Sequence, residues 1–160
     1  MKLFKKIGVG FIFVFIIAQF FSPEKNTNNL EDISAFITET NPPKVVRVIL
    51  ENTCYDCHSS NTTYPWYNKI TPVNYWLASH VNDGKKHLNF SKWDSYSFGK
   101  KDHKLDELIE EVEEKEMPLK SYTLTHSDAK LSDAQISAIT EWAKNVRTLY
   151  TLRKKTNLQY

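Results

Sequence analysis

The chain has only two cysteines, and both lie in the run Cys54-Tyr55-Asp56-Cys57-His58. Two thiols three positions apart, followed at once by a histidine, form the c-type haem attachment pattern. The spacing suits that chemistry, because each thiol can add to one vinyl group of the porphyrin while the adjacent imidazole is carried beneath the ring to ligate the iron. The run therefore predicts one covalent haem, attached through Cys54 and Cys57 and ligated by His58.

Three other uses of the cysteines remain open. A thioredoxin-like redox pair needs a βαβ setting, which the flanking sequence does not indicate. A structural zinc site needs four ligands, and histidines would have to supply the rest because there is no second cysteine pair. A disulfide between Cys54 and Cys57 would close a very small loop and contribute little stability. The haem interpretation is favoured, because an export signal precedes the motif and haem is attached to such proteins outside the cytoplasm.

The first 23 residues carry that export signal. Three lysines among the first six residues precede an apolar run over residues 7–21, which only Gln19 interrupts. A positive segment before an apolar one is typical of a secretory signal, with the lysines on the cytoplasmic side and the body exported. Because no small-x-small cleavage site precedes Pro23, we expect residues 1–23 to remain as a membrane anchor, with a removed signal peptide as the alternative. The body would lie on the periplasmic side of the cytoplasmic membrane, anchored or released.

The composition is that of one ordinary globular domain. The chain has 160 residues, 41% hydrophobic and 25% charged, with 4 glycines and 6 prolines. This length is enough to bury a core and too short for a second large catalytic domain. The formal charge is +2, but residues beyond 23 include 18 basic and 19 acidic side chains, a net charge of −1. A nearly neutral body gives no reason to expect nucleic-acid binding.

Apolar residues recur at helical spacing through the body, and no run alternates for long enough to indicate a sheet. The fold class is therefore predicted to be all-α. The expected helices each have an apolar face and a recognisable start or stop, and they cover residues 32–40, 43–53, 72–84, 102–116 and 132–150. Asp102 is expected to cap the fourth helix, and Ser132 with Gln135 forms a capping box for the last. Residues 85–101 have less periodicity and are expected to be irregular.

These patterns divide the chain into four parts. Residues 1–23 form the signal or anchor, and residues 24–31, which are polar and rich in asparagine, form a tether. Residues 32–152 form the predicted haem-binding domain, and residues 153–160 form a C-terminal tail.

The axial group opposite His58 can be a methionine, a histidine or an open position. Met117 is the only methionine besides the initiator, and it follows an acidic helix and precedes a proline. His80 is the rival, because it lies on the apolar face of the expected helix 72–84. The remaining histidines lie in polar, loop-like contexts and are expected at the surface, namely His87, His103 and His126.

The order of these features resembles that of class I c-type cytochromes: a helix leading into Cys-x-x-Cys-His, a later Met-Pro, and a capped C-terminal helix. The body is more closely similar to a family of exported bacterial haem-binding domains. The likeness covers residues 33–150, and the segments that carry it are Cys54–Ser59, Tyr64–Tyr67, His80–Gly84, Leu88–Ser91 with Trp93, and Glu116–Pro118. The resemblance implies a cytochrome c-like helical domain around one haem c, with His58 and Met117 as axial ligands.

The function expected from this set of residues is one-electron transfer outside the cytoplasm, with redox partner proteins of unknown identity and membrane contact only through the N-terminal segment. We do not expect an enzyme. Two alternatives are a haem-based sensor or small-ligand binder, in which Met117 is weakly held, and a peroxidase-like enzyme, in which His80 assists at an open site. Acids over residues 106–116 form either a solvated helix face or a docking patch for a redox partner.

A group of aromatic residues lies between the two proposed axial ligands. Such rings supply apolar wall area with few rotatable bonds, as a buried porphyrin or an ordinary core requires. Together with a methionine ligand, a pocket of this kind favours the ferrous state, so a relatively high reduction potential is expected. The residues concerned are Tyr64, Trp66, Tyr67, Trp76, Phe90 and Trp93.

Overall fold

A computed structural model describes residues 2–28 and 32–157, and within these ranges it is helical, with one isolated bridge between Thr27 and Asn61. The predicted all-α class is confirmed. The α-helices are α1 (Lys2–Ala18), α2 (Ser34–Thr40), α3 (Lys44–Thr53), α4 (Tyr55–His58), α5 (Val73–His87), α6 (Phe98–Glu113), α7 (Lys120–Thr123) and α8 (Asp133–Asn157). Short 3₁₀ turns separate some of them, namely η1 (Trp66–Lys69), η2 (Phe90–Ser95) and η3 (Ser127–Ala129).

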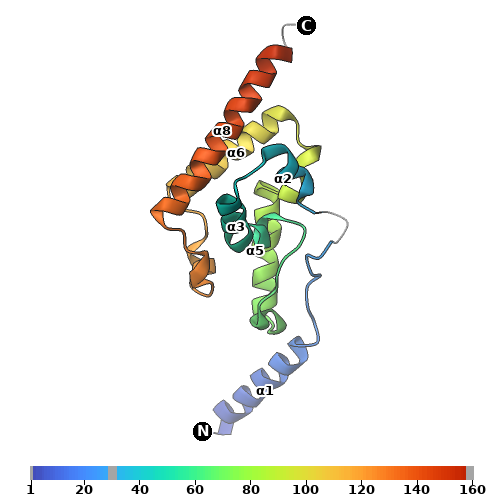
Figure 1. The fold of residues 1–160 in the computed structure, drawn as a ribbon. Coiled ribbons are helices and arrows are strands. Elements are labelled where there is room, and N and C mark those ends of the chain that lie inside the picture. The colour runs from blue at the N-terminus through green and yellow to red at the C-terminus, as the bar shows by residue number, and fades with distance from the viewer. Residues whose placement is uncertain (1, 29–31, 158–160) are drawn as a thin grey trace.

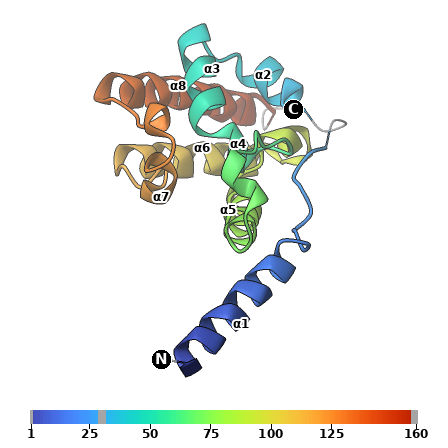
Figure 2. The same ribbon diagram turned by 90° about the horizontal axis from the view of Figure 1, so that it is seen from below.

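The long helices α6 and α8 pack along each other, and α2 and α3 lie against them (Figures 1 and 2). Phe36 of α2 is fully buried where these elements meet. Its ring centroid lies 4.5 Å from that of Phe90, 5.1 Å from that of Trp93 and 5.9 Å from that of Trp142. Burial of large rings is a main source of stability in so small a domain. The aromatic cluster therefore joins α2, η2 and α8.

Helix α8 begins as its sequence predicts. The backbone nitrogen of Ser132 donates to Oε1 of Gln135 at 2.9 Å, and the backbone nitrogen of Gln135 donates to Oγ of Ser132 at 3.4 Å. This reciprocal pair is the predicted capping box, which satisfies backbone donors at the helix start. Further along, Nε1 of Trp142 donates to the carbonyl oxygen of Thr40 at 3.1 Å and ties α8 to the end of α2.

Several predicted helix boundaries are wrong, and α8 runs on to Asn157 rather than ending at residue 150. Helix α5 does not stop at Asp83-Gly84 but continues to His87. Helix α6 begins earlier than predicted, because Ser97 rather than Asp102 caps it, with Oγ accepting from the backbone nitrogen of Lys100 at 3.3 Å. Asp102 instead accepts a hydrogen bond from Arg147 of α8. Residues 85–101, expected to be irregular, thus hold the end of α5, all of η2 and the start of α6.

Helix α1 extends away from the helical body and buries no residue (Figure 2). It covers 17 residues. Among the described residues, the structure contains no helix with both the length and the apolar character that crossing a membrane requires.

The residues that follow α1 form hydrogen bonds with the helical body. The side chain of Gln19 both donates to and accepts from the backbone of Thr71, at 3.1 and 2.9 Å. The side-chain amide of Asn26 donates to the carbonyl oxygen of Ser59 and to Oγ1 of Thr62, each at 2.9 Å. Within the expected tether over residues 24–31, Asn26 thus pairs with the chain next to α4, and residues 29–31 lie outside the described residues.

Candidate functional site

The Cys-x-x-Cys-His motif begins at Cys54, between α3 and α4, and its other residues form α4, a single helical turn. Helix α3 turns Val46, Ile49 and Leu50 into the core. The backbone nitrogen of Cys54 still donates to the carbonyl oxygen of Leu50 at 2.9 Å, and the carbonyl of Cys54 accepts from the nitrogen of His58 at 2.9 Å. The packing of α3 against the core therefore sets the position of Cys54. The helical turn of α4 sets the directions in which the side chains of the motif point.

The ring of His58 is oriented by the backbone. Its Nδ1 lies 3.0 Å from the carbonyl oxygen of Leu88, which can only accept, so Nδ1 carries the proton and Nε2 keeps its lone pair. Burial is the main effect on this side chain, and it lowers the pKa of His58 below that of a free histidine. A neutral imidazole with one nitrogen held by a carbonyl is the usual form of a metal-ligating histidine.

The two cysteines are free thiols. Burial raises the pKa of Cys54 to about 12, with the charge of Cys57 adding to the effect, and burial raises the pKa of Cys57 to about 11. Reactive redox cysteines have lowered rather than raised pKa values, so a thioredoxin-like pair is not supported. Within the described part of the chain there is also no group of three or more histidine, cysteine or acidic side chains arranged to hold a metal ion. This leaves zinc without a ligand set.

A cavity of about 420 Å³ lies beside α4, and Cys54, His58 and Met117 all line it. This volume falls in the range of small-molecule and cofactor sites. Its apolar walls come from η2, from α6 and from the residue that follows α5, and they comprise Leu88, Phe90, Leu108 and Val112. The cavity thus brings together one of the predicted attachment cysteines and both predicted axial ligands.

Met117 reaches this cavity because α6 ends in a tight reversal. Lys115 has a φ of 60°, in the left-handed region, and the backbone nitrogen of Glu116 donates back to the carbonyl oxygen of Glu111 at 3.0 Å. This is the usual hydrogen-bond pattern of a helix that stops and turns back. The backbone nitrogen of Met117 donates to the same carbonyl at 3.0 Å. The chain therefore returns along the end of α6, with Met117 half-buried at the cavity.

The rim of the cavity is charged. Acidic side chains of α6 and of the turn after it lie there, together with one lysine and one histidine: Glu107, Glu110, Glu111, Glu114, Lys104 and His87. His87 was expected simply at the surface, and although its side chain is exposed it lines the cavity. The sequence pattern missed this placement because it ended the helix at Gly84, before the turn of α5 that carries His87. His103 is exposed, as expected, with Nε2 3.2 Å from Glu107.

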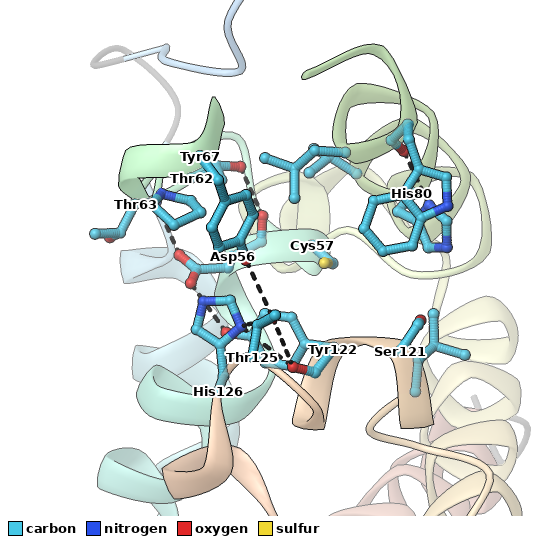
Figure 3. Close-up of a pocket in the computed structure, with 15 residues that line it drawn as sticks. Asp56, Cys57, Thr62, Thr63, Tyr67, His80, Ser121, Tyr122, Thr125 and His126 are labelled. Carbon is cyan, nitrogen blue, oxygen red and sulfur yellow. Dashed lines mark hydrogen bonds between the residues drawn. The ribbon is translucent and has the colours of Figure 1, made fainter. Parts of the chain in front are cut away.

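A second, smaller cavity of about 40 Å³ lies on another side of α4 (Figure 3). Cys57 lines it, and so does His80. The imidazole of His80 lies 4.3 Å from the ring of Trp76, and its Nδ1 lies 2.9 Å from the carbonyl oxygen of Trp76. His80, the rival axial ligand, thus lines a different cavity from His58 and Met117.

The same small cavity holds a group of hydrogen-bonded residues that the sequence pattern did not single out. Tyr122 and His126 stack at 4.2 Å, and Tyr122 donates to Asp56 (Figure 3). His126, expected at the surface, is half-buried here. No local pattern marks these contacts, because Asp56 occupies a variable position of the motif and Tyr122 lies in a short polar segment.

Gly84 is where α5 passes closest to α4. A Cβ at this position would lie 2.8 Å from the carbonyl oxygen of Cys57 and 3.2 Å from its Cβ. Real Cβ atoms do not approach backbone so closely, so α4 or α5 would have to move. This contact explains why a glycine stands inside a helix here, although glycine usually weakens helices.

Gly84→Ala is expected to destabilise the protein by about 1–3 kcal/mol, because overpacking against backbone outweighs the gain of about 1 kcal/mol in helix propensity. Gly99→Ala is the matched control, since Gly99 lies in α6 with nothing within 4 Å of the added Cβ. Urea unfolding of both variants measures the difference. Equal midpoints for the two would contradict the close approach at Gly84.

The side chains around the larger cavity fit an iron porphyrin. An oriented neutral imidazole and a thioether are the two commonest axial groups for iron in c-type sites. Cys54 adds a protonated thiol at the same cavity, and its apolar walls suit the macrocycle. Cys57 lines the smaller cavity on another side of α4.

Comparison with known families agrees with a haem site. A profile of the haem-binding domain family matches residues 13–145. No match is found among curated proteins or among solved structures. The match spans most of the chain and includes the motif, both cavities and Met117. The chain therefore belongs to the haem-binding domain family.

Proposed function

We propose that this protein is a monohaem c-type electron carrier that works outside the cytoplasm. The observation that carries the proposal is the cavity of about 420 Å³ that Cys54, His58 and Met117 line together. The proposal treats the protein as a carrier rather than an enzyme.

In this proposal each residue has one task. Cys54 and Cys57 hold the haem by thioether bonds, and His58 ligates through Nε2 while Leu88 keeps its ring in place. Met117 supplies the second axial group, and the walls exclude water. The bound haem supplies one-electron exchange at its iron. Burial and a methionine ligand both favour the ferrous state, so we expect a reduction potential well above that of bis-histidine haems.

The proposed thioether attachment requires export, because haem is attached covalently to such proteins outside the cytoplasm. Three lysines at the start of helix α1, ahead of its apolar residues, support the proposal that residues 1–23 direct export. The acidic rim of the cavity supports contact with partner proteins that present a basic surface, since opposite charges steer encounter.

The spectrum of the oxidised and reduced protein tests the proposal. We expect six-coordinate low-spin iron in both states, a near-infrared sulfur-to-iron band in the oxidised state, and little CO binding in the reduced state. A high-spin oxidised spectrum with ready CO binding would contradict electron transfer and favour a sensor or small-ligand binder. Peroxidase-like turnover that His80→Ala abolishes would favour the enzymatic alternative.

A further inference from the structure

A single side-chain hydrogen bond links the haem-attachment motif to the chain that follows Met117. Oη of Tyr122 donates to Oδ2 of Asp56 at 3.1 Å. Asp56 lies between the two cysteines of the motif, and Tyr122 lies in α7, shortly after the Met117-Pro118 pair. Figure 3 shows the two side chains facing each other beside Cys57. The hydrogen bond therefore spans the two parts of the chain that carry opposite axial groups.

Asp56 is a fixed acceptor. Its other carboxylate oxygen, Oδ1, accepts from the backbone nitrogen of Thr63 at 2.8 Å, and its backbone carbonyl accepts from Oγ1 of Thr62 at 2.6 Å. Partial burial, and then the charge of Asp56, raises the pKa of Tyr122, so its hydroxyl stays protonated and able to donate. Hydrogen bonds to a charged acceptor are about twice as strong as neutral ones.

Apolar packing does little to hold the segment after Met117. Helix α7 has no buried residue, and the side chains of Leu119 and Leu124 are 38% and 84% exposed. Between Met117 and η3, the contacts to the rest of the domain include Tyr122 with Asp56, the ring of His126 stacked on Tyr122, and Oγ1 of Thr125 3.2 Å from Oη of Tyr67. Of these, the hydrogen bond to Asp56 is the one that reaches the motif itself.

We propose that Tyr122 and Asp56 form a clamp that keeps Met117 at the haem iron. The inference rests on the proposed function, since it concerns how firmly the axial methionine is held. Tyr122 is a positioning residue: it touches neither Met117 nor the ring in this role, and it acts through the short chain between them. Without this hydrogen bond, the side chain of Met117 would dissociate from the iron more often. External ligands would then bind to the iron more readily.

The test uses the haem-loaded protein and the binding of imidazole to its oxidised form, which requires Met117 to leave. Tyr122→Phe and Asp56→Ala are each expected to raise imidazole affinity about ten-fold, the effect of losing one hydrogen bond to a charged group, and to weaken the near-infrared sulfur-to-iron band. Asp56→Asn is expected to stay closer to the wild type, because its amide can donate to the tyrosine oxygen while its carbonyl still accepts from Thr63.

Tyr150→Phe is the matched control. Oη of Tyr150 donates to Oε1 of Glu39 at 2.8 Å, so the variant also loses a tyrosine–carboxylate hydrogen bond, but one between α8 and α2. Its imidazole affinity and near-infrared band are expected to match the wild type. If Tyr122→Phe keeps the imidazole affinity and the near-infrared band of the wild type, the clamp is wrong. The clamp is also wrong if Tyr122→Phe and Tyr150→Phe change these two properties by the same amount. If the wild type itself lacks the sulfur-to-iron band, the proposed methionine ligation fails instead, so the two failures are distinguishable.

Discussion

Met117→Ala is expected to abolish the near-infrared sulfur-to-iron band and to convert the oxidised protein from low-spin to high-spin. The methyl group of alanine cannot ligate iron, and the side chain it replaces lines the cavity together with His58. The reduced variant is expected to bind CO readily, because one axial position is then open. Optical spectra of both oxidation states, with and without CO, make the measurement.

A sulfur-to-iron band can be assigned to Met117 directly, because Met117 is the only methionine apart from the initiator. A sulfur-to-iron band therefore has one available source. Met117→His is the companion variant: it is expected to restore six-coordinate iron without the band and to lower the reduction potential, as histidine does relative to methionine. An alanine variant with the wild-type spectrum would show that another group occupies the axial position.

Phe36→Ala is expected to cause the largest loss of folding stability among single core substitutions, about 3–5 kcal/mol. The side chain is fully buried and contacts the rings of Phe90, Trp93 and Trp142, so its removal leaves a cavity between three elements. Domains of this size have total stabilities of about 5–15 kcal/mol, so the variant would lose a large share. Urea unfolding followed by tryptophan fluorescence gives the value.

Phe98→Ala is the control for that experiment. Phe98 is 50% exposed at the start of α6 and makes one ring contact, at 5.8 Å to Tyr150. Its truncation is expected to cost clearly less than that of Phe36, because less apolar surface returns to water. If the two variants lost equal stability, the aromatic cluster would not be the centre of the core.

The elements that the sequence predicts correctly are those whose signals are local. The capping box of Ser132 and Gln135 forms within one turn, so nothing distant is needed to specify it. Boundaries that depend on tertiary contacts are the ones that differ. Helix α6 starts at Phe98 rather than after Asp102, which places Lys101 where it is buried and contacts Glu39 of α2 at 2.6 Å.

Gly84 is a second position where a tertiary contact, rather than the local sequence, decides the structure. Aspartate followed by glycine is a common turn signal, and the approach of α5 to Cys57 explains why a glycine nevertheless stands inside this helix. The continuation places His87 at the larger cavity and lets the carbonyl of Leu88 hold the ring of His58.

The candidate site likewise has residues that the local sequence predicts and residues that only the tertiary structure brings there. The motif specifies which side chains carry the chemistry, because thiols and imidazole at that spacing have few other uses. It does not specify the residues that contact it from elsewhere in the chain, such as Leu88, whose carbonyl oxygen holds the ring of His58, or Tyr122, which donates to Asp56. Met117 was predicted from its place in the chain, and the reversal at Lys115 accounts for its position at the cavity.

Covalent haem is the central claim, and a pyridine haemochrome spectrum tests it most directly. The full chain is produced together with the machinery for export and haem attachment, and its intact mass is measured on the same sample. We predict one haem for each chain, with the spectrum of a porphyrin whose two vinyl groups are saturated, and loss of that haem in the double variant Cys54→Ala/Cys57→Ala. Colourless wild-type protein, with both thiols unmodified although the attachment machinery is active, would contradict the account.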